Sequence, residues 1–156
     1  MRRFLAVVGA LAIVVVVLVA VGITFAVRQG IAADLESRAF VDAAVPAIAS
    51  SWRQQQLVDL ATPELRDSVN PAELADFFAK LSALGSLIKY DGSVGHSMLS
   101  YFSGSDSAVT ASYEAKAEFK NGAATFEIGL LKRNGRWMIN GFHVNPDLKP
   151  TSNGSA

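Results

Sequence analysis

One uncharged stretch constrains this chain more than any other feature. Phe4–Val27 holds 24 residues without a charged side chain, and sixteen of them are Val, Leu, Ile or Phe. At ~1.5 Å rise per residue, a helix of this length reaches about 36 Å, which is enough to cross a ~30 Å hydrocarbon core with some tilt. A lone strand in lipid would leave its backbone groups unpaired. The sequence therefore predicts one transmembrane helix.

The charges around this stretch predict its orientation. Arg2 and Arg3 precede it and Arg28 follows it, so the positive charge before it favours a cytoplasmic N-terminus. We expect a single-pass protein of the inner (cytoplasmic) membrane with an extracytoplasmic C-terminal domain. The alternative is a signal peptide cleaved near Gly30-Ile31-Ala32, which would give a secreted form. Signal h-regions usually run ~7–15 residues, so the length of the stretch favours an uncleaved signal anchor.

The rest of the chain is long enough for one globular domain. We expect a cytoplasmic stub and anchor over residues 1–28, a folded domain over residues 29–147 and a disordered polar tail over residues 148–156. About 120 residues can bury a core without disulfides. The chain has no cysteine, which excludes disulfides, thiol catalysis and a Cys-ligated metal.

Charge and small residues bear on the expected partners. From residue 29 onward, the chain has 11 basic and 14 acidic side chains, which gives a net charge of −3, and it has no basic stripe. We therefore expect no nucleic acid partner. The expected partners are the lipid bilayer and a membrane or envelope protein. The pairs Ala6/Ala10 and Gly22/Ala26 would let two membrane helices approach closely, which leaves a weak homodimer open, although small residues are also ordinary filler in such helices.

Helical patterns occupy the first half of the domain. Apolar residues recur at three- and four-residue spacing from Ile31 to about Leu60, and Pro46 predicts a kink or a break within this run. Thr62-Pro63-Glu64 reads as an N-cap with a first-turn proline, and Asn70-Pro71-Ala72-Glu73 repeats the signal as a capping box. The second of these helices should end at Gly85 and bury five apolar side chains, namely Leu74, Phe77, Phe78, Leu81 and Leu84.

After Gly85 the apolar period changes to two, which predicts strands. Leu87–Asp91 and Val94–Phe102 are expected strands on either side of Asp91-Gly92-Ser93. From Ser107 the alternation is regular, with Ala117 on the inward face and Glu118 on the outward face. The whole domain is therefore expected to be α+β, with helices packed on a curved antiparallel sheet.

Two Asn-Gly turns predict the strand register. The turn at Asn121-Gly122 would place Ala117 opposite Phe126. The turn at Asn134-Gly135 would place Leu130 opposite Ile139 and Lys132 opposite Trp137. The apolar residues stand at odd-numbered positions up to Ile139 and at even-numbered positions beyond it. One extra residue accounts for this change, which predicts a β-bulge at Asn140-Gly141. Pro146 is expected to end the last strand.

These motifs together resemble a known group of proteins. Trp52, Leu60-Ala61-Thr62-Pro63-Glu64-Leu65, Phe77-Phe78, Phe119-Lys120-Asn121-Gly122 and Gly135-Arg136-Trp137 appear in an order that resembles small bacterial envelope proteins of unknown function with a cystatin-like or nuclear-transport-factor-2-like domain behind an anchor. The resemblance covers roughly Ala33–Pro146 and implies a cone-like sheet whose mouth holds a ligand or a catalytic group. Some relatives in that wider superfamily are isomerases or dehydratases, but none of their catalytic motifs matches a position here.

Few polar residues are expected on the inward face. Tyr113 beside Trp137 and Phe142 would line a pocket mouth, with additions at Tyr90, Tyr101 and His96; the alternative is a core tyrosine whose hydroxyl reaches the rim. The two histidines lack metal-ligand spacing, and we expect no catalytic residue, metal or cofactor. The sequence favours a tethered interaction or accessory module over a small cone-fold enzyme, because no paired acid and base face inward.

Overall fold

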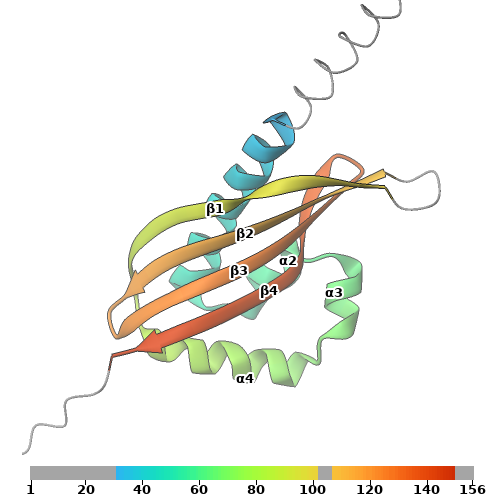
Figure 1. Cartoon of the computed structure of the whole chain (residues 1–156). Coiled ribbons are helices and arrows are strands. Elements are labelled where there is room, and N and C mark those ends of the chain that lie inside the picture. The colour runs from blue at the N-terminus through green and yellow to red at the C-terminus, as the bar shows by residue number, and fades with distance from the viewer. Residues whose placement is uncertain (1–30, 102–106, 150–156) are drawn as a thin grey trace, which may run out of the picture.

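The computed structural model describes residues 31–101 and 107–149. A long helix over residues 31–51 is followed by α2 (Gln54–Leu60), α3 (Pro63–Ser68), α4 (Pro71–Leu81) and the 3-10 turn η1 (Ser82–Leu84). Four strands then form one antiparallel sheet in chain order: β1 (Leu87–Tyr101), β2 (Ser107–Phe119), β3 (Gly122–Arg133) and β4 (Arg136–Leu148). Helices pack against a curved sheet (Figure 1), and this confirms the predicted α+β class.

The predicted membrane anchor cannot be compared with this architecture. Phe4–Val27 lies outside the described residues, as does the tail from residue 150 onward. Across residues 31–101 and 107–149, no helix has both the length and the apolar character that a membrane crossing requires.

A kink or a break was predicted at Pro46; the long helix continues through this proline, so the break is wrong. The break comes at Trp52, which has a positive φ of 48°, and at the extended residue Arg53. Trp52 packs its ring 5.3 Å from that of Phe119 and donates its indole N–H to the carbonyl of Gly85 at 3.4 Å. A proline removes one helical hydrogen bond, whereas a core tryptophan fixes the direction of the chain. Tertiary packing therefore sets the end of the helix.

The helix starts and the helix stop are largely as predicted. The Thr62 hydroxyl caps α3 by accepting from the Leu65 N–H at 3.2 Å, and the Asn70 side chain caps α4 by accepting from the Ala72 N–H at 2.9 Å. Gly85 follows η1 with a φ of 80°. Phe78, Leu81 and Leu84 are buried, but Leu74 and Phe77 are only partly buried. The expectation that all five apolar side chains join the core is therefore wrong for two of them.

Residues 87–101 form a single strand rather than two. The register against β2 shifts between Tyr90 and Ser93, where Gly92 has a φ of 87°. This glycine therefore marks an irregularity inside β1 and not a turn between strands.

The strand register of the first hairpin differs from the predicted register by two residues. The turn consists of Lys120 and Asn121, so Ala115, and not Ala117, lies opposite Phe126. Neither turn residue has positive φ. The turn is instead held from outside, because the N–H groups of Lys120 and Asn121 donate to the carbonyls of Ser86 at 3.0 Å and Leu84 at 2.9 Å. An even shift preserves the face of every side chain, so the predicted inward face of β2 is confirmed.

The second hairpin and its bulge are confirmed. Asn134 and Gly135 have φ values of 53° and 76°, and Lys132 pairs with Trp137. Gly129 pairs with Gly141 and Leu130 with Ile139, which leaves Asn140 as the extra residue. Pro146 does not end β4, which runs to Leu148. β4 is an edge strand, where a proline can face away from the ladder.

The core lies between the inward face of the sheet and the helices. Phe119, Phe126, Ile128, Leu130 and Ile139 are each at most 2% exposed. From the long helix, Val41, Val45 and Ile48 are equally buried. Full burial of such side chains stabilises a fold by roughly 1.5–3 kcal/mol each. The space between the inward face of the sheet and the long helix is therefore filled with side chains.

Gly122 provides a test of how closely β3 and β4 approach. A Cβ at Gly122 would lie 2.2 Å from the Asp147 carbonyl oxygen, whereas a Cβ at Gly141 would meet nothing closer than 3.9 Å. We expect Gly122→Ala to lower the free energy of unfolding by about 1–3 kcal/mol, because the two backbones must separate. Gly141→Ala is the matched control and should change it by less than ~0.5 kcal/mol. Thermal unfolding of the full chain in mild detergent, followed by circular dichroism, measures both. Equal melting temperatures for the two variants would contradict this pairing.

Candidate functional site

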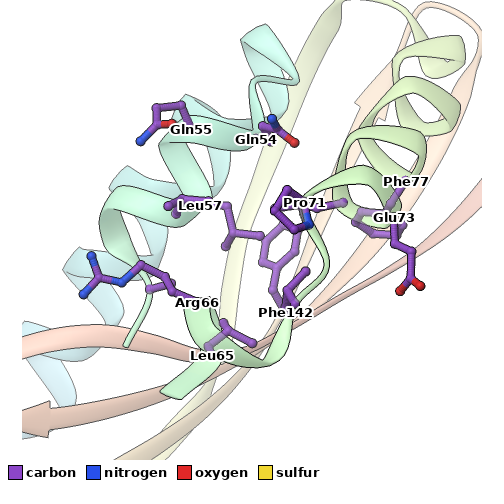
Figure 2. Close-up of a pocket in the computed structure, with 13 residues that line it drawn as sticks. Gln54, Gln55, Leu57, Leu65, Arg66, Pro71, Glu73, Phe77 and Phe142 are labelled. Carbon is purple, nitrogen blue, oxygen red and sulfur yellow. The ribbon is translucent and has the colours of Figure 1, made fainter. Parts of the chain in front are cut away.

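A cavity of about 470 Å³ opens between three short helices and the last strand. Its apolar wall comes from α2, α3, α4, the connecting segments and β4 (Figure 2). The apolar lining residues are Leu57, Val58, Ala61, Leu65, Val69, Pro71, Leu74, Phe77 and Phe142. The volume falls in the ~300–1,000 Å³ range of small-ligand pockets.

Polar side chains sit at the edges of this cavity. Arg66 and Glu73 are exposed and lie on opposite sides of the opening in Figure 2. Gln54 and Gln55 line it from α2. The side-chain oxygen of Gln54 is buried and accepts no hydrogen bond from the described part of the chain. An unsatisfied buried acceptor costs about 1–3 kcal/mol of stability.

The short helices leave this space open because of the way they are connected. Ala61 forms an isolated bridge with Ile139, and the Thr62 N–H donates to the Ile139 carbonyl at 2.8 Å. This bridge fixes the junction of α2 and α3 on the edge of β4. The chain must then turn again at Asn70 to start α4. Leu74 and Phe77 from α4 consequently face α2 and α3 across a gap.

A second group of polar contacts joins the long helix to the sheet. Asp42 accepts hydrogen bonds from the hydroxyls of Tyr90 and Ser93, both at 2.7 Å. Ser37, which is fully buried, shares a hydrogen bond of 2.9 Å with the Tyr113 hydroxyl. Asp34 accepts from the backbone N–H of Ser97 at 2.5 Å and from its hydroxyl. We call these contacts the polar seam.

The polar seam changes the acidity of two of its members. The hydrogen bonds from the Ser97 hydroxyl and N–H hold the pKa of Asp34 below its usual value. Burial, together with the hydrogen bond to the Asp42 carboxylate, raises the pKa of the Tyr90 hydroxyl well above its usual value. Asp34 is therefore a charged acceptor at neutral pH and Tyr90 a neutral donor. Neither group is poised for proton transfer near neutral pH.

Three charged or aromatic groups meet at the other side of the long helix. Lys132 forms an ion pair with Glu36, and its ammonium lies 5.5 Å from the ring centroid of Trp137. The hydrogen bond from Lys132 is the main cause that lowers the pKa of Glu36. The Trp137 indole N–H has no hydrogen bond of normal geometry to a described residue, but it adds to this lowering.

The six residues predicted to line a pocket mouth do not gather in one place. Phe142 lines the cavity. Tyr113 is 2% exposed and belongs to the core, but its hydroxyl bonds the buried Ser37, whereas the alternative expected it to reach the rim. Tyr90 belongs to the polar seam and Trp137 packs beside Lys132. His96 is exposed on β1, and the side chain of Tyr101 lies outside the described residues.

Sequence reasoning missed most of the cavity. Leu74 and Phe77 were expected in the core because they share the apolar stripe of α4 with Phe78 and Leu81. The available signal is the width of that stripe, since one helix face cannot bury all of these side chains against a single neighbour. Nothing in the sequence distinguishes Gln54 from the neighbouring Gln55 and Gln56.

The arrangement supports binding more readily than chemistry. Within residues 31–101 and 107–149, no cluster of three His, Asp or Glu is placed to hold a metal ion. The titratable residues at the cavity, Arg66 and Glu73, are exposed at its opening. Comparison of the chain with protein-family models, curated proteins and solved structures finds no match.

Asp34 gives the polar seam a pH dependence that can be measured. Its pKa in the folded state lies below the usual value of 3.8, so its stabilising effect is complete above that value. The effect is lost as the pH falls through the lower, folded-state pKa. We expect Asp34→Asn to lower the unfolding temperature near neutral pH and to reduce the further loss on acidification to about pH 3.

The matched control for this prediction is Asp67→Asn, which changes an exposed aspartate on α3. It should preserve the acid dependence of the wild-type chain. The prediction is contradicted if the two variants lose the same stability between neutral pH and about pH 3.

Proposed function

We propose that this chain is a membrane-anchored extracytoplasmic binding module that captures an apolar group of a protein partner, or a small ligand of similar size, in the cavity between α2, α3, α4 and β4. The observation that carries the proposal is the cavity itself, which has an apolar wall and exposed charges at its opening. Convergent polar groups in an apolar pocket are the usual signature of a ligand site.

The chemistry of the ligand follows from the lining. The apolar wall favours binding of an aliphatic or aromatic group, because burial of apolar area contributes roughly 25 cal/mol per Å². The exposed Arg66 and Glu73 at the opening add a preference for polar groups beside the apolar one. A peptide segment with a large apolar side chain offers both features. This is the reason for preferring a protein partner, and it fits an accessory role at a membrane.

The packing of the sheet argues against catalysis inside the cone. Side chains of Phe119, Phe126 and Leu130 fill the inward face, and they leave no room there for a substrate. A cone-fold isomerase or dehydratase, the alternative class, would need a polar group within ~2.6–3.2 Å of a reacting atom. The helices on a four-stranded antiparallel sheet support the proposal of a cystatin-like or nuclear-transport-factor-2-like domain, but this architecture serves many functions.

Binding can be tested with a defined probe. We expect N-acetyl-4-fluoro-L-phenylalaninamide to bind the full chain in nanodiscs with a dissociation constant on the order of 10 mM, because burying one aromatic side chain offers about 3 kcal/mol. Broadening of the probe's fluorine resonance measures the binding, with empty nanodiscs as the blank. Leu74→Gln should weaken it several-fold, because a polar amide replaces part of the wall.

Two further variants sharpen this test. Leu148→Gln changes a leucine that is 51% exposed on β4 and does not line the cavity, so it should bind the probe like the wild type. Gln54→Met removes the unpaired oxygen and should raise the unfolding temperature. Broadening that is equal in the wild type, Leu74→Gln and empty nanodiscs would refute binding in this cavity.

The proposed topology rests on the sequence and has its own test. The chain has no cysteine, so a single cysteine reports its position without background labelling. We expect Lys120→Cys to react with a membrane-impermeant thiol reagent in intact cells, or in spheroplasts where an outer membrane blocks access. A cysteine inserted after Met1 should react only after lysis, because positive charge favours a cytoplasmic N-terminus. Labelling of the N-terminal site alone would reverse the orientation, and release of the domain by a carbonate wash would indicate cleavage.

A further inference from the structure

The distance between the apolar stretch and the folded domain is short. Three residues, Arg28, Gln29 and Gly30, separate Val27 from Ile31, where the described part of the long helix begins. Four steps of fully extended chain span at most about 14 Å. If Phe4–Val27 crosses a membrane as proposed, the start of the long helix therefore lies within about 14 Å of the place where the chain leaves the lipid.

The same end of the domain includes the turn between β3 and β4. Glu36, in the second turn of the described long helix, forms an ion pair with Lys132 near the end of β3. The long helix begins at this end of the sheet, while the turn between β2 and β3 lies at the opposite end (Figure 1). β3 separates the two turns by 12 residues, or about 40 Å. One turn is thus near the proposed membrane and the other is far from it.

The near end has the composition of a lipid-facing surface. Lys132, Arg133 and Arg136 place three cations within five residues, and the half-buried Trp137 follows them. Two large apolar side chains of the long helix are exposed here, Ile31 at 57% and Leu35 at 66%. Tryptophan is enriched at membrane interfaces, and clustered cations attract anionic lipid headgroups.

The acidic residues nearby only partly cancel this charge. Lys132, whose side chain is 23% exposed, pairs with Glu36, and Arg133, whose side chain is 48% exposed, pairs with Glu64. The exposed pair of Arg133 and Glu64 is weak, so Arg133 can exchange this partner for a lipid phosphate. Arg136 forms no ion pair with another residue of the described ranges. Arg133 and Arg136 therefore remain available to an anionic surface.

We propose that the anchor-side surface, made of Ile31, Leu35, Lys132, Arg133, Arg136 and Trp137, docks on an anionic lipid bilayer and holds the domain in one orientation on the membrane. The proposal rests on the proposed membrane anchor, because the tether brings this surface close to lipid. Ile31 and Leu35 supply the apolar contact, and the turn between β3 and β4 supplies the charge. The docked domain keeps the turn between β2 and β3 away from the bilayer.

The test measures the distance of each turn from the lipid in the full chain. Single cysteines at Asn134 and at Lys120 carry a donor dye, and the protein is reconstituted in vesicles with an acceptor dye on a small fraction of headgroups. One set of vesicles contains phosphatidylcholine alone, and the other replaces about 30% of it with phosphatidylglycerol. We expect stronger energy transfer from position 134 than from position 120, and an increase with phosphatidylglycerol only at position 134.

Charge variants connect this signal to the named residues. Arg133→Gln with Arg136→Gln removes two cations and should lower the ratio of docked to undocked domain in anionic vesicles about 30-fold. The matched control, Lys120→Gln with Lys149→Gln, removes two exposed cations at the far end of the sheet and should leave transfer from position 134 unchanged. Circular dichroism checks that each variant remains folded.

The outcomes separate this proposal from the one on which it rests. A chain that does not float with the vesicles overturns both the anchor and the docking surface. A chain that floats but gives equal transfer from both positions overturns docking alone. The same holds if phosphatidylglycerol has no effect, or if both pairs of substitutions act alike. Binding of the fluorinated probe is measured separately, so the outcome of the docking test does not affect the test of the cavity.

Discussion

The fold depends on one helix lying closely against the inward face of the sheet. Three of the inward positions on β2 are alanines, at 111, 115 and 117, and the long helix contributes Ala44 and Ala49 to the buried set. Small side chains let the backbone of a helix approach a sheet, and the larger Tyr113, Phe119 and Phe126 then pack around it. An interior built in this way has little tolerance for added volume, because close-packed cores resist extra methylene groups.

The polar seam decides where along the sheet this helix sits. Apolar contacts are non-directional, so Val41, Val45 and Ile48 alone would tolerate small shifts along the helix axis. The hydrogen bonds of Ser37 to Tyr113 and of Asp42 to Tyr90 and Ser93 do not. A shift by one turn would leave buried hydroxyls unpaired at about 1–3 kcal/mol each. The seam therefore fixes the position of the helix more than it adds to net stability.

The inward and outward faces of β2 and the N-caps of α3 and α4 could be predicted from the sequence, because they depend on local chemistry. Thr62 and Asn70 cap their helices through their own side chains, and the alternation in β2 survives an even shift of register. The first turn could not be predicted, because Lys120 and Asn121 are held by the carbonyls of Ser86 and Leu84, far away in sequence. The end of the long helix could not be predicted for the same reason, because Trp52 is held by its contacts with Phe119 and Gly85. Where a long-range contact competes with a local preference, the contact decides.

The cavity could not be predicted for a different reason. Periodicity identifies an apolar face, but it does not show whether a second surface covers that face. Leu74 and Phe77 have the same spacing as the buried Phe78 and Leu81. What leaves them uncovered is the bridge of Ala61 to Ile139, which holds α2 and α3 on the edge of β4. That bridge is a pairing between distant residues, and the sequence carries no local sign of it.

The contact between Arg133 and Glu64 links the two proposed surfaces and limits how strongly one can affect the other. Glu64 lies in the first turn of α3, which forms one wall of the cavity, and Arg133 lies beside the turn that is proposed to face lipid. Lipid phosphate competing for Arg133 would release this side of α3. The pair is exposed, so its contribution is only about 0–1 kcal/mol, and a coupling of that size changes an affinity by at most about five-fold. The Thr62 N–H remains bonded to the Ile139 carbonyl whatever Arg133 does. Docking on the membrane would therefore orient the cavity without opening or closing it.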